Sequence, residues 1–276
     1  MRILVPLKQV PDPDNSNKLR VSSDNLALDF GSSEPKTNPF DEYALESALR
    51  LTEDGRSPRV RKGETLLVTL GPVETEVMLR AGLATGADRA FRVSTKEEDL
   101  DPARVAHVLA RMATREACDL VLMGKQSVDG DSNEVGQRVA ALLGWPQATF
   151  VSKIAARGND TLDVDREIDG GVQHVSLRLP AVITVDLRIV TSDGVRSEIT
   201  PNDFSYAPGV RFASLPAIMQ ARRKPLTVEE LEAFGTVPKR QLKYVRYEIP
   251  SAKAAGRVIA TPSELVRLLA SEAKVL

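Results

Sequence analysis

Near-continuous apolar runs separated by amphipathic segments limit most strongly how this chain can fold. The runs lie at residues 2–8, 64–71, 89–93, 119–124 and 181–185. Strands without polar alternation are typical of parallel sheets covered on both faces. The segments between them have apolar residues at helical spacing, at residues 39–54, 73–85, 102–118 and 135–143. This alternation predicts a doubly wound α/β fold with a mostly parallel sheet, whose ligands bind at the carboxyl ends of strands.

The pattern changes after Trp145. Residues 150–187 alternate with period two around Gly158-Asn159-Asp160 and Asp169-Gly170-Gly171, which predicts an antiparallel extension of the sheet. Further predicted elements are a hairpin at 18–30, a loop at 190–214, short helices at 215–225 and 227–235, an extended segment at 241–250 and a final helix from Thr261 with a capping box to Glu264. Such short, proline-containing elements are typical of an arm that packs on a partner.

Composition excludes several classes of function. The chain has 276 residues and a net charge of -1, which argues against a nucleic-acid or anionic-membrane surface. The single cysteine, Cys118, permits no intrachain disulfide, and two distant histidines argue against a zinc site. Neither a signal peptide nor a membrane span is expected, so we expect a cytoplasmic protein without membrane insertion.

The loop GKQSVDGDSNEV, residues 124–135, follows a predicted strand and precedes a predicted helix. It matches neither G-x-x-x-x-G-K-[ST] nor G-x-G-x-x-G. Its glycines allow a tight backbone approach to a ligand, and the helix start near Asn133 points free N–H groups toward the loop. Lys125 adds positive charge, and Ser132 or Asn133 is suited to cap the helix or donate to a phosphate. Asp129 and Asp131 must point away from a phosphate. The loop is therefore as consistent with a self-capped turn as with a nucleotide site.

Other candidates have simpler explanations. Asn38 is placed to cap the helix that begins at Pro39, and Phe40 is suited to core packing. Cys118 is expected to be a small buried hydrophobic residue. No nucleophile–base pair is evident, so we expect no catalytic residues and no metal.

The sequence closely resembles the beta subunit of electron transfer flavoprotein. The matching stretches, in the family's order, are RILVPLKQV, NPFDEYALESALRL, LRAGLATGADRAFRV, DLVLMGKQSVDGDSNEVGQ, GWPQATF, REIDGG, LRLPAVITVDLRI and ASLPAIMQARRKP. The resemblance implies a three-layer core of the adenine-nucleotide-hydrolase-like or flavodoxin-like type. It also implies a core at residues 1–225 and a C-terminal arm at 226–276 that packs on an alpha subunit.

The resemblance further implies an electron carrier and not an enzyme. FAD is held mainly by the alpha subunit, and electrons pass from acyl-CoA dehydrogenases to a membrane quinone oxidoreductase. The beta subunit holds a structural AMP. Carried onto this chain, the nucleotide site comprises Pro6, Asn38, Pro39, Phe40, Asp41, Leu70, Gly124, Lys125, Gln126, Ser127, Val128, Asp129, Gly130, Asp131, Ser132, Asn133, Glu134 and Val135.

Partner contacts also follow from the resemblance. The loop at 208–225 corresponds to the segment that docks on the partner dehydrogenase, with Leu215 as its apolar anchor. Glu167 corresponds to a residue that holds the flavin domain in position. Phe40 corresponds to an aromatic that reaches toward the flavin, whereas a second family aromatic falls near Pro13, where this chain has none.

Two alternatives stay open. Some relatives carry a second FAD in the beta crevice and bifurcate electrons; Asp129-Gly130-Asp131 resembles their loop, whereas Asn133 and Gln137 favour AMP. A protein of another class, such as a nucleotide-binding regulatory protein of the universal-stress type or an adenylating ligase, would use a similar scaffold.

Overall fold

The protein is represented by a computed structural model, which describes residues 1–26, 28–29, 34–158, 160–251 and 256–276. The chain divides into two compact units. The first comprises Met1–Leu19 and Phe30–Lys243, and the second Arg20–Asp29 and Tyr244–Leu276. The predicted hairpin at 18–30 lies partly outside the described residues, since positions 27 and 30 are not described.

Among the described residues, ten strands form one sheet in the first unit, in the order β13-β12-β11-β14-β10-β1-β8-β9-β16, with β15 beside β11. Along this order, each pair of neighbouring strands from β11 to β16 is parallel. The β11–β12 and β12–β13 pairs are antiparallel. The bounds are β1 Arg2–Pro6, β8 Glu64–Gly71, β9 Arg89–Ser94, β10 Leu120–Gly124, β11 Gln147–Arg157, β12 Thr161–Ile168, β13 Gly171–Arg178, β14 Ala181–Val185, β15 Val195–Arg196 and β16 Leu226–Glu230.

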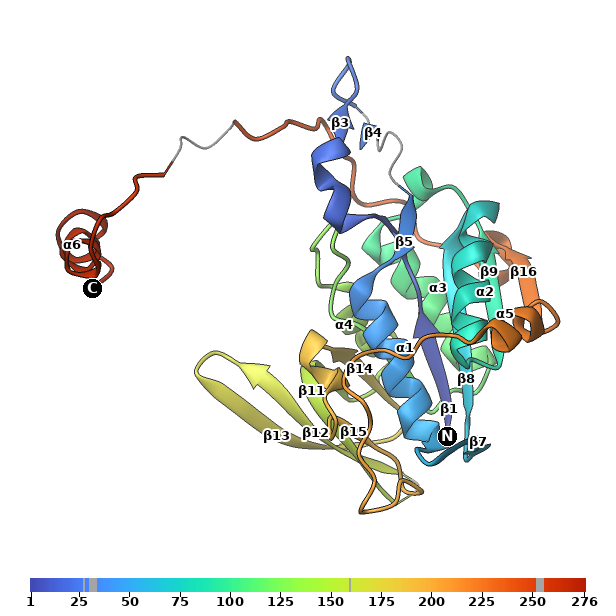
Figure 1. The fold of residues 1–276 in the computed structure, drawn as a ribbon. Helices are drawn as coiled ribbons and strands as arrows, with labels where there is room; N and C mark the ends of the chain where they lie inside the picture. Colours follow the sequence, from blue (N-terminus) through green and yellow to red (C-terminus); the bar gives the residue numbers. More distant parts are fainter. Residues whose placement is uncertain (27, 30–33, 159, 252–255) are drawn as a thin grey trace. The chain divides into compact units, whose positions relative to one another are not determined.

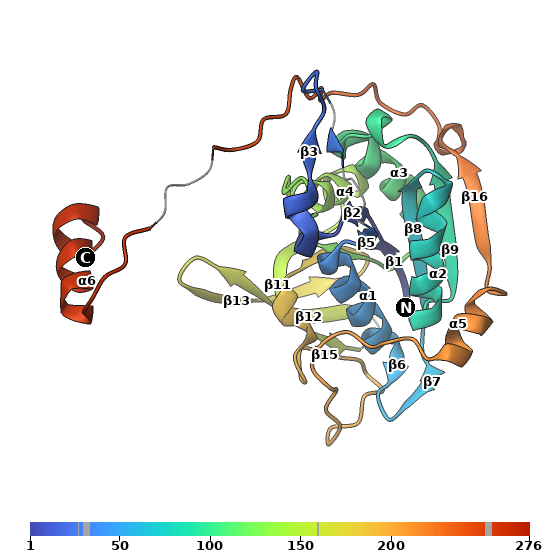
Figure 2. The same ribbon diagram turned by 45° about the horizontal axis from the view of Figure 1, so that its top comes forward.

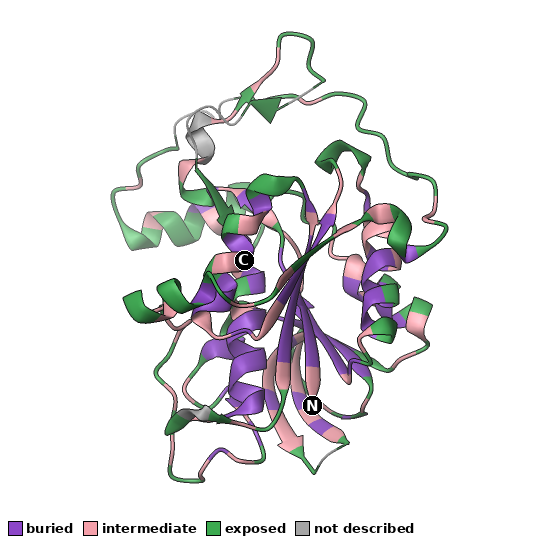
Figure 3. Ribbon diagram, turned by 90° about the vertical axis from the view of Figure 1, so that its right-hand side faces the viewer, coloured by how far each residue is buried: buried purple, intermediate pink, exposed green. Residues whose placement is uncertain are grey.

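Helices cover both faces of the sheet because alternate strand residues point to opposite sides. Ile3 and Val5 pack with α1 (Pro39–Thr52) and α2 (Glu76–Thr85). Leu4 packs instead with α3 (Pro102–Arg115) and α4 (Val135–Leu143). Figure 1 shows the resulting three layers, and Figure 3 shows that the central strands are almost wholly buried. The predicted doubly wound, mostly parallel α/β fold with an antiparallel extension is confirmed.

Smaller elements complete the first unit. They are the antiparallel pairs β2 (Gln9–Pro11) with β5 (Pro35–Thr37) and β6 (Glu53–Asp54) with β7 (Ser57–Arg61), and helix α5 (Leu215–Ala221). Turns of 3-10 helix lie at Pro13–Lys18, Val73–Thr75, Glu97–Asp99, Leu187–Val190 and Leu231–Phe234. The predicted loop at 190–214 contains one short strand, β15.

The prediction of a helix at 227–235 is wrong for the first half of that range. Residues 226–230 form β16, which pairs in parallel with β9 from Leu226 opposite Ala90 to Glu230 opposite Ser94. Only Leu231–Phe234 turns, as a 3-10 helix. Hydrogen bonding along an open sheet edge outweighs the helix propensity of the two glutamates. The compact unit thus continues past residue 225, to Lys243.

The second unit contains little regular structure. Strands β3 (Arg20–Val21) and β4 (Leu28–Asp29) pair antiparallel, so the described part of the predicted hairpin is confirmed. Tyr247 N donates to Asn25 O at 2.8 Å. Helix α6 (Pro262–Leu268) begins as predicted, because the Thr261 hydroxyl accepts from Glu264 N at 3.2 Å, and a π-helical turn follows at Leu269–Ala273.

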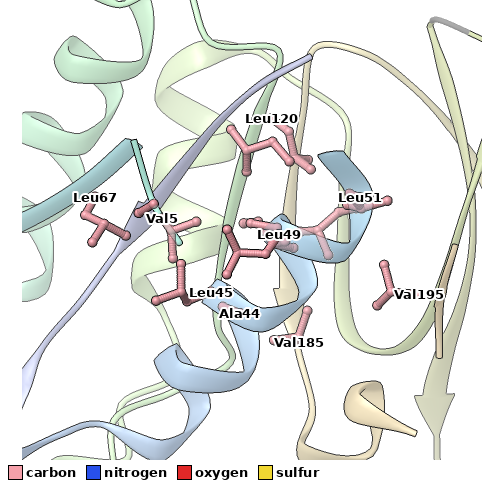
Figure 4. Close-up of a cluster of buried hydrophobic side chains, with 14 of the residues drawn as sticks. Val5, Ala44, Leu45, Leu49, Leu51, Leu67, Leu120, Val185 and Val195 are labelled. Atoms are coloured by element: carbon pink, nitrogen blue, oxygen red, sulfur yellow. The ribbon is translucent and has the colours of Figure 1, made fainter. Parts of the chain in front are cut away.

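Truncation of Leu67 tests the core between the sheet and its first helical layer. Leu67 is fully buried on β8, packs among Val5, Leu45 and Leu49 (Figure 4), and would lie 2.6 Å from a Cβ at Gly82. We predict that Leu67→Ala lowers the free energy of unfolding in urea by about 3 kcal/mol, because it removes buried methyl groups and leaves a cavity. Leu142→Ala, at an exposed leucine of α4, is the control and should change it by less than about 0.5 kcal/mol. Equal losses would contradict this packing.

Candidate functional site

The order of the strands creates a crevice at one place in the sheet. From β1 the chain moves outward through β8 and β9, and then returns to form β10 on the other side of β1. The connections that leave β1 and β10 therefore diverge, and a crevice opens at the carboxyl ends of these two strands. Pro6 ends β1 and Gly124 ends β10. The segments at 38–41 and 124–135 are both at this end of the sheet.

Asn38 joins these two segments directly. Its side-chain Nδ2 donates to Gln126 O at 2.9 Å, and its Oδ1 accepts from Val128 N at 3.2 Å. The prediction that its side chain caps α1 is wrong, because the amide is used by the loop 88 residues away. The Asn38 backbone carbonyl serves as the cap of the helix, accepting from Asp41 N and Glu42 N. Both hydrogen bonds of the amide hold the start of the 124–135 loop in place.

Asp41 is a buried carboxyl at the same point. Its Oδ2 accepts from Lys8 N at 2.9 Å, so it ties α1 to the chain that leaves β1. Burial raises its pKa from 3.8 to about 7, against the opposing effect of hydrogen bonds from Lys8, Asn38 and Gly124. A Cβ at position 124 would lie 2.6 Å from both Asp41 Oδ1 and Phe40 Cβ, so this approach requires the glycine.

The two aspartates of the loop have partners within the chain. Lys8 Nζ donates to the Asp129 carboxylate at 2.6 Å, and Gln126 Nε2 donates to Asp131 Oδ1 at 2.7 Å. Asp131 and Asn133 have positive φ angles of 49° and 46°, which short polar side chains tolerate. Both carboxylates thus form local contacts that shape the loop.

Lys125 does not supply free charge to this loop, contrary to the prediction. Its Nζ forms an ion pair with Asp186 Oδ2 at 2.7 Å. It also lies over the rings of Phe40 and Phe150, 5.1 and 5.2 Å from their centroids. Phe40 is only 7% exposed in this chain. Phe150 was not a candidate from the sequence, since its contact with Lys125 depends on a bulge between β11 and β14.

Helix α4 begins at Val135 without a side-chain cap. Its N-cap residue is Glu134, which makes no capping hydrogen bond, so the prediction that Ser132 or Asn133 caps the helix is wrong. Gln137 Nε2 donates to Asn133 O at 2.9 Å. Gln137 Oε1 is buried and has no hydrogen-bond partner among the described residues. An uncapped helix start beside an unsatisfied buried acceptor is suited to a ligand that both donates and accepts hydrogen bonds.

The remaining candidates lie on other elements. Leu70 is the penultimate residue of β8 and packs partly against the α3–α4 layer. Glu167, on β12, accepts from Arg188 Nη1 at 2.9 Å. Cys118 is buried as expected, and burial raises the pKa of its thiol to about 12. In the part of the chain that the structure describes, no group of acidic, cysteine and histidine side chains is arranged to hold a metal ion.

Leu215 lies in a strongly exposed apolar segment, which we call the docking segment, residues 212–220. Phe212 is 94% exposed, Leu215 72% and Met219 66%. The segment borders a groove of about 920 Å³ between α1 and α2. Phe212 was not a candidate from the sequence. Ser214 caps α5 by accepting from Ala217 N, and an aromatic residue two positions before such a cap was a usable signal. Exposed apolar side chains gathered in this way mark an interaction surface.

The fold and the crevice define a doubly wound α/β protein with a candidate ligand site at its topological switch point. The family model described as "Electron transfer flavoprotein domain" matches residues 28–233. The chain is 38% identical to the electron transfer flavoprotein subunit beta of Bradyrhizobium diazoefficiens over 276 residues, covering 100% of each chain. It is 37% identical to the human subunit beta, covering 98% of this chain and 96% of that one. A mitochondrial subunit beta of Arabidopsis thaliana is 37% identical, with 100% of each chain covered.

The three relatives align with 98 to 100% of this chain. The chain therefore belongs to the electron transfer flavoprotein family and is similar throughout to its beta subunits. Among the described residues, none of the helices combines the length and the hydropathy needed to cross a membrane.

The pH dependence of stability tests the burial of Asp41. Its pKa is about 7 in the folded chain and ordinarily 3.8, so the folded chain binds this proton more tightly, and stability falls as pH rises between these values. We predict that the wild type loses about 2.5 kcal/mol of unfolding free energy from pH 5 to 8 relative to Asp41→Asn. Urea unfolding of both proteins at several pH values measures this difference. Parallel pH profiles would show that Asp41 is ionised at little cost.

Proposed function

We propose that this chain is the beta subunit of a heterodimeric electron transfer flavoprotein. In this proposal it pairs with an alpha subunit that holds most of the FAD. The heterodimer takes electrons from acyl-CoA dehydrogenases and related flavoenzymes and passes them to a quinone oxidoreductase. The observation that carries the proposal is the full-length similarity to beta subunits, together with a built crevice and an exposed docking segment.

We further propose that the crevice holds a structural AMP. The uncapped start of α4 would donate backbone N–H groups to its phosphate, and the Gln137 Oε1 would accept from a hydroxyl or amino group of the nucleoside. Asn38 and Asp41 would hold the loop in its binding shape without touching the phosphate, since their polar atoms are used by the loop and by Lys8. The residues around the crevice therefore fit a bound AMP.

The alternative within the family is a second FAD in this crevice, with electron bifurcation. By resemblance, Asn133 and Gln137 favour AMP, and Gln137 Nε2 donates to Asn133 O and Oδ1 at 2.9 and 3.2 Å, so the two residues act together in this loop. A universal-stress-type regulatory protein is the alternative of another class. An exposed apolar docking segment favours the carrier over that regulator, which would not need such a surface.

The chain's role in electron transfer is to bind and position. The flavin supplies the redox chemistry when bound, and we assign no catalytic residue to this chain. Glu167 is proposed as a residue that helps to hold the flavin domain, although in this chain it is paired with Arg188. We propose a cytoplasmic location.

We also propose that the C-terminal arm packs on the alpha subunit. In residues 226–276, the part after Lys243 has many exposed apolar side chains: Tyr244, Val245, Ile249, Val258, Leu265 and Val266. Such side chains outside the sheet-containing unit fit burial by a partner chain.

Leu215→Ala tests the docking role. An exposed leucine that enters a partner pocket contributes about 2 kcal/mol to binding. We therefore predict that the variant heterodimer is reduced by an acyl-CoA dehydrogenase with kcat/KM lowered about thirtyfold, while its flavin content stays the same. Leu142→Ala, at an exposed leucine of α4, is the control and should keep the wild-type rate. Loss of flavin in Leu215→Ala would show that Leu215 is a packing residue and would contradict the docking role.

A further inference from the structure

The chain that leads into the docking segment is fixed to α1 by buried charges. Figures 1 and 2 show that the connection between β15 and α5 runs past α1 toward α2. Arg50 of α1 is 1% exposed, and its guanidinium donates to Thr191 O at 2.8 Å, Ala207 O at 3.0 Å and Gly209 O at 2.9 Å. One buried arginine therefore holds two backbone carbonyls of this connection, those of Ala207 and Gly209, together with the Thr191 carbonyl just before β15.

Arg211 completes this first anchor. Its guanidinium donates to Glu46 Oε2 at 2.7 Å and to Glu53 Oε2 at 2.8 Å, and both carboxylates are about 2% exposed. Glu46 also accepts from Arg50 Nε at 2.7 Å. Removing one member of such a buried network leaves uncompensated charge, so the connection is held firmly at the residue that precedes Phe212.

A second anchor fixes the other end of the docking segment to α2. Arg80 of α2 donates to Ala221 O at 2.8 Å and Lys224 O at 2.7 Å, at the end of α5. In return, Lys224 Nζ donates to Leu83 O at 2.9 Å and Ala87 O at 2.6 Å, at the end of α2. Each helix end thus receives a cation from the other, which satisfies carbonyls that have no partner within their own helix.

Between these anchors the apolar side chains of the docking segment are exposed. A surface that is already ordered loses less conformational entropy when a partner binds than a mobile one does. We propose that the two anchors pre-organise the docking segment for the partner flavoenzyme, and that Arg211 and Lys224 are positioning residues for this docking. This inference rests on the proposed docking function. It adds residues that act through the segment and need not touch the partner.

Three variants of the heterodimer test the proposal. Arg211→Met and Lys224→Met each remove one anchor, and Arg223→Met removes the same charge from an exposed neighbour of Lys224. Backbone hydrogen exchange of residues 212–221 and steady-state reduction by an acyl-CoA dehydrogenase are measured for each. In the two anchor variants, we expect backbone hydrogen exchange of this segment to be about fivefold faster. We also expect KM for the heterodimer to be about three to ten times higher, with kcat and flavin content unchanged. Arg223→Met should match the wild type in exchange, and any rise in its KM should be smaller than in the two anchor variants. Lys224→Met keeps the test available if Arg211→Met fails to fold.

Three outcomes would overturn the proposal. Unchanged exchange in Lys224→Met would show that the anchor does not order the segment. A KM raised equally in Arg223→Met, with unchanged exchange, would show that charge alone matters. Faster exchange with an unchanged KM would show that the anchors have no positioning role. In that case, a slow Leu215→Ala variant would confine the failure to the anchors. A Leu215→Ala variant with an unchanged rate would show that the proposed docking function itself fails.

Discussion

Parallel pairing of β1 with both β8 and β10 is the constraint on which the rest of the structure depends. Because the chain leaves β1 and β10 toward opposite faces of the sheet, a crevice opens at the carboxyl ends of these two strands. Two polar side chains at the start of α1 tie the walls of this crevice together. Asn38 holds the 124–135 loop, and Asp41 holds the chain that follows β1. A buried carboxyl and a buried amide are tolerated there because their polar atoms are paired.

Helix α1 links the two surfaces that matter for the proposed function. Its start contacts the candidate nucleotide crevice through Asn38 and Asp41. Its later turns carry Glu46 and Arg50, which hold the chain that leads to the docking segment. The same helix packs its apolar side on β1 and β10, so both surfaces are built on one rigid element. The proposed function therefore needs only one core to order both the candidate nucleotide crevice and the docking segment.

The fold was largely predictable, because buried parallel strands such as 2–6 and 120–124 are marked by local apolar runs and the helices by local periodicity. Strand β16 was not, since its sequence has helix propensity and only the open edge of β9 makes it a strand. The segments of the candidate site were also predictable from their positions at strand ends. The partners of Asn38 and Lys125 were not, because they lie 88 and 61 residues away, and nothing local in the sequence encodes such contacts.

The content of bound nucleotide in the heterodimer tests the central claim most directly. Co-expression with the cognate alpha subunit, followed by release and chromatographic quantification of bound nucleotides, provides the measurement. The account predicts one FAD and one AMP per heterodimer, with AMP reduced when Asn38→Ala frees the 124–135 loop. Two FAD and no AMP would contradict it: the crevice beside β1 would then be a second flavin site, and the interpretation of Asn133 and Gln137 would be wrong.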